Sequence, residues 1–342
     1  MIYAHRMQAF VLVSAVLLTA TGLAHAADKQ IKIDGSSTVY PITEAVAEEF
    51  QKNKKGAVKV TVGVSGTGGG FKKFCRDEID IASASRPILK SEIDICKAAG
   101  IGFIEMPVAY DALTVIVNPK NDWLNSITVA ELKKIWEPAA QGKIMTWKQV
   151  NPAWPDTPLK LYGAGADSGT FDYFTEAIVG KSKSSRGDFT ASENDNVLVT
   201  GVANDKNALG YFGFSYYIEN QKKLKAVAII ADKDTGKVKG GANAAILPSE
   251  KTVEDGSYQP LSRPVFIYVN AKSANKAEIK EFVEFYMSKG PALVKEVKYI
   301  PLPAKAYALN IQHFNQKKLG TVFDGNAAVG VKIEDLMKRE AK

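Results

Sequence analysis

The first third of the chain repeats one pattern: a short apolar strand, a loop rich in glycine and hydroxyl residues, and then a helix. Strands are predicted over 31–34, 58–64 and 79–82, where apolar residues alternate or cluster. Helices are predicted over 42–52 and from 71 to 76. Strands that alternate with helices favour an α/β fold whose parallel sheet is covered by helices on both faces. Ligands of such sheets bind at the carboxyl ends of the strands, where these loops would converge.

Two later apolar strands predict a division into two lobes. Residues 109–118 and 263–270 are strongly apolar and are interpreted as the segments that cross between the lobes. The first lobe would then be discontinuous, built from 27–108 and 266–342, and the second would comprise 109–265. A chain of 342 residues is long enough for two lobes of ordinary size. Two crossings form a hinge, which suits a cleft that closes around a small ligand.

Residues 1–26 have the features of a cleaved export signal. His5 and Arg6 precede an apolar stretch over 10–20, and Ala24-His25-Ala26 forms a small-x-small cleavage site. The apolar stretch is too short to remain as a membrane-spanning helix. No cysteine stands at the cleavage site, so a lipid anchor is not expected. The mature protein is expected to be exported and soluble.

Composition argues against several classes of function. The chain has 44 Lys and Arg against 37 Asp and Glu, a net charge of +7 with both signs interspersed, so no nucleic-acid partner is expected. Once 1–26 are removed, His313 is the only histidine, which disfavours a metal site or a Ser-His-Asp triad. The glycines at 63–70 lack the Lys and Ser/Thr of a P-loop and the last glycine of a dinucleotide motif. No cofactor is therefore expected.

The two cysteines, Cys75 and Cys96, are 21 positions apart. In an oxidising compartment the simplest interpretation is a structural disulfide. The alternative, a redox or metal-binding pair, usually has closer spacing and histidine partners.

Hydroxyl residues gather in four loops, each where a strand gives way to a helix. Helix N-termini offer unpaired N–H groups that attract anions, glycines allow close approach, and hydroxyls add neutral donors. Arg86, in the third loop, could grip two oxygens at once. Together these groups suit a tetrahedral oxyanion, although each loop alone could be an ordinary helix cap. The hydroxyl residues are Ser36, Ser37 and Thr38; Ser65 and Thr67; Ser83 and Ser85; and Ser168 and Thr170.

At these loops the chain resembles the PstS family, the periplasmic phosphate-binding proteins of ABC importers. The matching motifs are DGSSTVYP at 34–41, GVSGTGGG at 63–70, SASRPI at 83–88, DSGTFDYF at 167–174 and YQPLSRP at 258–264. The resemblance covers nearly the whole mature chain. It implies a two-lobed type II periplasmic-binding-protein fold with hinge strands. It also implies a monomeric, non-enzymatic carrier that delivers inorganic phosphate to a membrane permease.

The resemblance also implies the residues that bind phosphate. Donors are expected from three of the four loops, namely Ser37, Thr38 and the N–H of Val39; Ser65; and Ser168, the N–H of Gly169, and Thr170. In the better-known branch of the family, an aspartate occupies the third loop and an arginine lies shortly before Ser-Gly-Thr. Here Arg86 and Asp167 suggest that this charged pair has exchanged lobes. Asp167 would accept the proton that phosphate keeps and sulfate lacks, or else it would only cap a helix.

Other functions remain open at this point. The ligand could be another oxyanion, such as sulfate, molybdate or arsenate. A secreted phosphatase would use a similar anion cradle, but it would also need an activated nucleophile or a metal. An adhesion role would leave no recognisable motif.

Overall fold

The computed structural model describes residues 29–231, 244–326 and 329–341. The predicted signal at 1–26 lies outside these residues and stays a prediction. Within the described ranges, no helix combines the length and the apolar character needed to cross a membrane.

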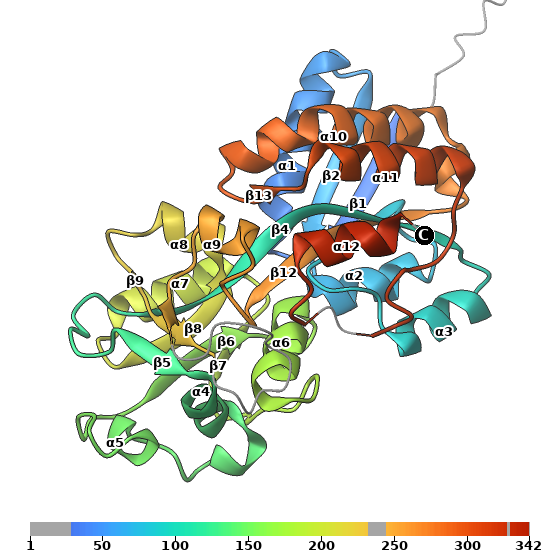
Figure 1. Ribbon diagram of the computed structural model, residues 1–342. Coiled ribbons are helices and arrows are strands. Elements are labelled where there is room, and N and C mark those ends of the chain that lie inside the picture. The colour runs from blue at the N-terminus through green and yellow to red at the C-terminus, as the bar shows by residue number, and fades with distance from the viewer. Residues whose placement is uncertain (1–28, 232–243, 327–328, 342) are drawn as a thin grey trace, which may run out of the picture.

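Two groups of parallel strands form the two ends of one long sheet (Figure 1). Its strand order is β2-β1-β3-β12-β4-β8-β6-β7. One end contains β1 (Lys29–Gly35), β2 (Val58–Val64) and β3 (Ile81–Ala84), and the other contains β6 (Lys160–Ala164), β7 (Thr190–Ser192) and β8 (Ala208–Gly213). The predicted strand over 58–64 is confirmed at its bounds, and the one predicted over 79–82 begins two residues later, at Ile81.

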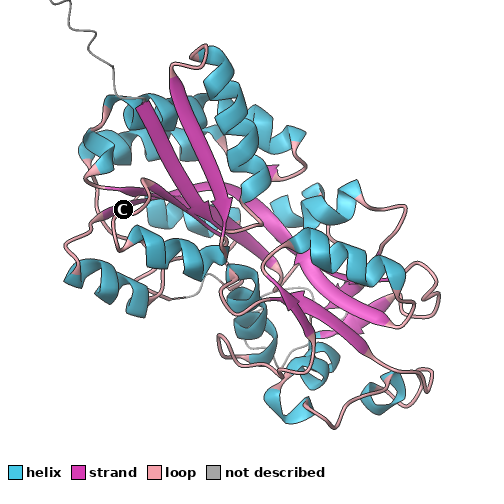
Figure 2. Cartoon of the chain, turned by 180° about the vertical axis from the view of Figure 1, so that it is seen from behind, coloured by secondary structure: helices cyan, strands magenta, loops and turns pink. Residues whose placement is uncertain are grey.

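The two central strands, β4 (Phe103–Val117) and β12 (Ser262–Asn270), pass between the lobes (Figure 2). β4 is buried along its whole length and begins at Phe103, earlier than the predicted 109. Its first part pairs with β12 and its last part, from Leu113, pairs with β8. Both pairings are antiparallel, so the expectation of a purely parallel sheet is wrong at the centre, where the chain leaves one lobe and returns. The two-lobed fold with hinge strands is confirmed, whereas the lobe limits 27–108, 266–342 and 109–265 stay a proposal.

Helices cover both faces of the β1-β2-β3 end of the sheet. In Figure 1, α1 (Tyr40–Asn53), α10 (Ala277–Glu296) and α11 (Ala304–Gln316) lie on one side, and α2 (Gly66–Phe74) and α3 (Lys90–Ala98) lie on the other. α1 buries Ile42, Val46 and Phe50, which recur at helical spacing on one face. α12 (Ile333–Glu340) follows at the C-terminal end.

Short helices and strands complete the second lobe and the connections. The helices are α4 (Val129–Trp136), α5 (Trp147–Val150), α6 (Gly169–Phe174) with a π-helical continuation over Thr175–Val179, α7 (Asp195–Asn204), α8 (Phe214–Glu219) and α9 (Glu250–Glu254). The strands are β5 (Ser126–Thr128), β9 (Lys225–Ala226), β10 (Ala228–Ile230), β11 (Ala245–Ile246) and β13 (Ile300–Pro301). The 3-10 helices are Pro138–Ala140 and Ser273–Asn275.

Helix α2 begins at Gly66, not at the predicted Phe71, so most of the glycine-rich stretch is helix. The glycines are required by close packing. A Cβ atom at Gly66, whose φ is +77°, would lie 2.5 Å from the carbonyl oxygen of Asp167. A Cβ atom at Gly70 would lie 2.7 Å from the Cα atom of Gly35 in β1. The glycines therefore let this helix approach both its own sheet and the other lobe.

The predicted disulfide between Cys75 and Cys96 is confirmed. It joins the end of α2 to α3, with 4.4 Å between the two Cα atoms. Both cysteines are buried, which is typical of a structural bond.

Candidate functional site

The four hydroxyl-bearing loops come together where the two lobes meet. The Ser36 N–H donates to the carbonyl of Ser83 over 3.0 Å, which joins the first and third loops. The hydroxyls of Thr38 and Thr170, from opposite lobes, are 2.9 Å apart. All these groups stand at the carboxyl ends of strands, because β1, β2, β3 and β6 each end there. The convergence expected from the strand–loop–helix pattern is therefore present.

The first loop is fixed by groups from both lobes. The Ser37 hydroxyl donates to Asp195, the first residue of α7, over 3.1 Å. The hydroxyl of Tyr216 donates to the carbonyl of Ser37 over 3.0 Å, and that of Tyr299 donates to the carbonyl of Thr38. The N–H of Val39, predicted to face the ligand, donates to the carbonyl of Ser36 over 3.2 Å in the turn that starts α1.

The hydroxyls of the second loop bond to protein groups, and the phosphate contact predicted for Ser65 stays a prediction. Ser65, at the start of α2, donates its hydroxyl to Asp34. Thr67 lies directly against Gly169 of the other lobe. If residue 169 had a Cβ atom, that atom would be 2.4 Å from the Thr67 hydroxyl oxygen and 2.7 Å from the Ser85 hydroxyl oxygen. Only glycine at 169 allows α6 to come this near.

An arginine that the sequence interpretation left without a role lies at the centre of the site. Arg263 on β12 is completely buried and forms an ion pair with Asp111 on β4, with 2.9 Å from Nη2 to Oδ2. The same Nη2 group donates to the hydroxyls of Thr170, over 2.9 Å, and Thr38, over 3.4 Å. Its Nη1 group donates to the carbonyl of Gly169 over 3.4 Å. The sequence does contain a signal for this pair, because each of the two predicted apolar hinge strands carries one charged residue, Asp111 or Arg263. A charge buried in such a strand needs a partner of opposite sign.

Asp195 is a second carboxyl group of the site that sequence reasoning missed. Its side chain is buried, and burial raises its pKa to about 7 although the Ser37 hydroxyl and Arg263 favour the charged form. The negative charge of Asp111 acts in the same direction as burial. Asp195 can therefore hold or release a proton near neutral pH.

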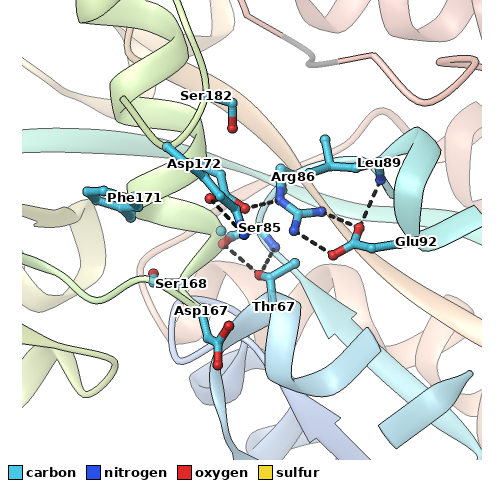
Figure 3. Close-up of polar contacts among 12 residues, drawn as sticks. Thr67, Ser85, Arg86, Leu89, Glu92, Asp167, Ser168, Phe171, Asp172 and Ser182 are labelled. Carbon is cyan, nitrogen blue, oxygen red and sulfur yellow. Dashed lines mark hydrogen bonds and ion pairs between the residues drawn. The ribbon is translucent and has the colours of Figure 1, made fainter. Parts of the chain in front are cut away.

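Arg86 is close to the site, but protein oxygens occupy most of its donors (Figure 3). Its Nη1 and Nη2 groups each donate over 2.8 Å to Glu92, and Nη1 also reaches the carbonyl of Pro87 over 3.0 Å. Its Nε group donates over 2.6 Å to Asp172 on α6, in the other lobe. Burial raises the pKa of Asp172, because desolvation outweighs the attraction of Arg86. The phosphate-binding role predicted for Arg86 is not tested by these contacts and stays a prediction.

Asp167 and Ser168 have different surroundings although they are adjacent. The Asp167 carboxylate is partly exposed and forms an ion pair with Lys72 of α2, over 2.8 and 3.0 Å. Its carbonyl oxygen accepts the N–H of Gly68 over 2.8 Å, which is a direct backbone link between the lobes. Ser168 caps α6 by accepting the N–H of Thr170 over 3.1 Å, so the capping interpretation holds for this residue.

Among the described residues, no group of three or more His, Cys, Asp or Glu side chains is arranged to hold a metal ion. The charges of the site are instead arranged as buried ion pairs next to hydroxyl groups and helix N-termini. Such an arrangement can bind an anion without a metal.

Comparison with known proteins agrees with this geometry. A model of the PBP superfamily domain matches residues 21–289. Protein SphX of Synechococcus elongatus is 55% identical over 310 residues, which cover 91% of this chain and 88% of that protein. The phosphate-binding protein PstS of Staphylococcus saprophyticus is 38% identical over 303 residues, covering 86% and 88%.

A solved structure shows the same fold. It is the X-ray structure, with bound phosphate, of a substrate-binding protein from Clostridium perfringens assigned to a phosphate ABC transporter. The TM-score is 0.64 at 26% identity, and the match covers 80% of this chain and 100% of that one. The chain therefore belongs to the PBP superfamily and, within it, to the PstS family of phosphate-binding proteins.

Proposed function

We propose that this protein binds inorganic phosphate between its lobes and delivers it to the permease of an ABC importer. The names of its relatives and the phosphate bound in the Clostridium perfringens structure support this function. In this proposal the protein acts in the periplasm, as a monomer, and as a carrier rather than an enzyme. Its relatives are likewise named as binding proteins.

One observation carries the proposal: hydroxyls from opposite lobes meet on a single buried guanidinium. Thr38 and Thr170 hydrogen-bond to each other and to Arg263, whose charge is held in place by Asp111. The oxygens of a phosphate ion can accept hydrogen bonds from these hydroxyls and from the guanidinium, and charge-assisted bonds of this kind are the strong ones. Binding would therefore join the two lobes through the ligand. The predicted ligands Ser37, Val39, Ser65, Ser168 and Gly169 flank this group and remain proposed contacts.

Selection against sulfate needs an acceptor for the proton that phosphate keeps. We assign this role to Asp195 rather than to Asp167, because Asp195 is buried beside Ser37 whereas Asp167 is paired with Lys72 at the surface. A carboxylate faced only by sulfate lone pairs would be repelled. Asp195→Asn should reduce the preference for phosphate over sulfate, and Asp167→Asn should leave it unchanged. The reverse result would restore the role predicted for Asp167.

Titration calorimetry tests the function itself. The ligand-free protein is titrated with phosphate and then, separately, with sulfate, arsenate and molybdate. Binding of phosphate in the micromolar range or tighter, which needs about −8 kcal/mol, is the expected result. Absence of heat with phosphate, or tighter binding of another oxyanion, would overturn the proposal.

A single hydroxyl tests the geometry. Thr170→Val removes the hydroxyl that reaches Arg263 while keeping the size of the side chain. A hydrogen bond to a charged group contributes about 1.5–3 kcal/mol, so the Kd for phosphate should rise about 10- to 100-fold. Thr200→Val is the matched control, because the Thr200 hydroxyl is exposed and donates to the carbonyl of Asn196 within α7.

A further inference from the structure

The side chain of Arg86 links the two lobes through an asymmetric pair of carboxylates. On one side, Glu92 in the first turn of α3 holds two of its nitrogens, each at 2.8 Å, within the lobe of β3. On the other side, Nε reaches Oδ2 of Asp172 in α6, at 2.6 Å. Both Arg86 and Asp172 are 2% exposed. The arginine is thus held by Glu92 in one lobe, and its Nε group forms a charge-assisted hydrogen bond to Asp172 in the other.

Contacts within its own lobe fix the orientation of the Arg86 side chain, independently of Asp172. Its guanidinium lies 5.7 Å from the ring centre of Phe71 in α2, and the carbonyl of Pro87 accepts from Nη1. With the two bonds to Glu92, four of its five N–H groups have protein acceptors in the structure. The Nε–H direction is therefore set by the first lobe, and within the described part of the chain Asp172 is the group that accepts from it.

Asp172 connects this contact to the phosphate-binding loop. It lies in the first turn of α6, and its N–H donates over 3.2 Å to the carbonyl of Ser168. Its other oxygen, Oδ1, has no hydrogen-bond partner among the described residues, and its nearest cation there besides Arg86 is the half-exposed Lys183 at 3.9 Å. Holding Asp172 therefore holds the start of α6, which carries Gly169 and Thr170.

We propose that Arg86 is an interlobe clamp: anchored by Glu92, it positions α6 through Asp172 and so sets how the lobes close on the ligand. The effect of the clamp on phosphate release rests on the function proposed above. The effect of the clamp on closure of the lobes does not. Burying an ion pair costs desolvation free energy, which offsets much of the attraction between the two charges. The main effect of such a pair is therefore to fix which groups face each other. In the closed protein no second acceptor for the Nε–H stands among the described residues, and in an opened protein water can accept from it. Loss of Asp172 should therefore penalise the closed state alone.

The variant that tests the clamp is Asp172→Ala, with Asp172→Asn as the conservative variant that keeps an oxygen acceptor. Asp188→Ala is the matched control: Asp188 accepts from Nε of the equally buried Arg186, but within one lobe. All three variants should lose stability. Only the two at Asp172 should change closure, and Asp172→Asn should change it less.

Closure can be followed without phosphate at the Gly68 amide, which donates to the Asp167 carbonyl of the other lobe. In the ligand-free protein, hydrogen exchange at Gly68 should be at least tenfold faster in Asp172→Ala than in wild type, and unchanged in Asp188→Ala. Equal exchange in wild type and Asp172→Ala, or equal acceleration in the control, would overturn the clamp.

Kinetics provide the second readout. If the protein binds phosphate, Asp172→Ala should release radiolabelled phosphate at least tenfold faster, with little change in the association rate. A wild type that binds no phosphate would refute the proposed function and leave the exchange measurement to decide the clamp. A wild type that binds phosphate, together with an Asp172→Ala variant that releases it within twofold of the wild-type rate, would refute the clamp alone.

Discussion

Replacement of Asp195 by asparagine should make the protein more stable, and by an amount that grows with pH. Asp195 is buried at the start of α7 and accepts the hydroxyl of Ser37. Burial raises its pKa from 3.8 to about 7. Asparagine keeps an oxygen acceptor for Ser37 and carries no charge, so the substitution removes the titration and little else.

The sign follows from the linkage between proton binding and folding. Below about pH 4 the carboxyl group is neutral in both the folded and the unfolded chain, and its burial costs no ionisation energy. Between about pH 4 and about pH 7 the unfolded chain releases the proton and the folded protein keeps it, so stability falls as pH rises. A difference of about three pKa units corresponds to about 4 kcal/mol in full, of which about 2–3 kcal/mol develops between pH 5 and pH 8.

Urea unfolding at about pH 5 and about pH 8, in buffers without phosphate, measures this effect. The quantity to compare is the free energy of unfolding of Asp195→Asn minus that of wild type. Burial also raises the pKa of Glu105 to about 7 and that of Glu340 to about 8, but these groups titrate in both proteins and cancel in the difference. The difference should grow by about 2–3 kcal/mol toward the higher pH.

A matched control is Asp167→Asn, because Asp167 is partly exposed and paired with Lys72. Its difference from wild type gives the comparison value for a carboxylate that is not fully buried. A flat difference for Asp195→Asn would mean that its carboxyl group is ionised in the folded protein across this range, and the electrostatic description of the site would be refuted.

Two further predictions concern the disulfide and the glycine contact between the lobes. Replacing Cys75 and Cys96 together by serine should lower the free energy of unfolding by about 3 kcal/mol, the value expected for a closed loop of this size; an unchanged urea midpoint would contradict a stabilising role. Gly66→Ala should weaken phosphate binding at least tenfold in calorimetry, because its Cβ atom would press on the carbonyl of Asp167 across the lobes. Gly100→Ala, at a similar φ of +67° with nothing within 4 Å of its Cβ atom, should cost about 1–2 kcal/mol of stability and leave affinity intact. Equal losses of affinity in the two glycine variants would refute the interlobe contact.

Local pattern was a good guide to the strand–loop–helix units. Apolar alternation marked β2 at its observed bounds, and the loops after the strands converge as the topology requires. The start of α2 was placed too late, because glycine has a low helix propensity and the helix at Gly66 is stabilised by tertiary packing instead. The two hinge strands are predicted from the sequence, but their antiparallel pairing is not, since a strand carries no local signal of its partner's direction.

The charged residues of the site also have partners that local sequence does not reveal. The sequence predicts that Arg86 binds phosphate because it stands in a hydroxyl-rich loop. In the structure its donors go to Glu92 and Asp172, and the predicted role stays a prediction. The sequence assigns no role to Arg263, which stands at the start of β12, although a buried charge there required a partner such as Asp111. Both arginines are buried, and only the tertiary structure shows which groups each of them meets.

The sequence alone determined an α/β chain with four hydroxyl-bearing loops and the motifs of its family, because strand and helix periodicity and motif spacing are local properties. It predicted the disulfide between Cys75 and Cys96, which the structure confirms. The tertiary structure decided which charges meet: Arg263 with Thr38 and Thr170, and Arg86 with Asp172. These partners come from segments about 90 to more than 200 positions apart, and only the packing of the lobes brings them within hydrogen-bond distance.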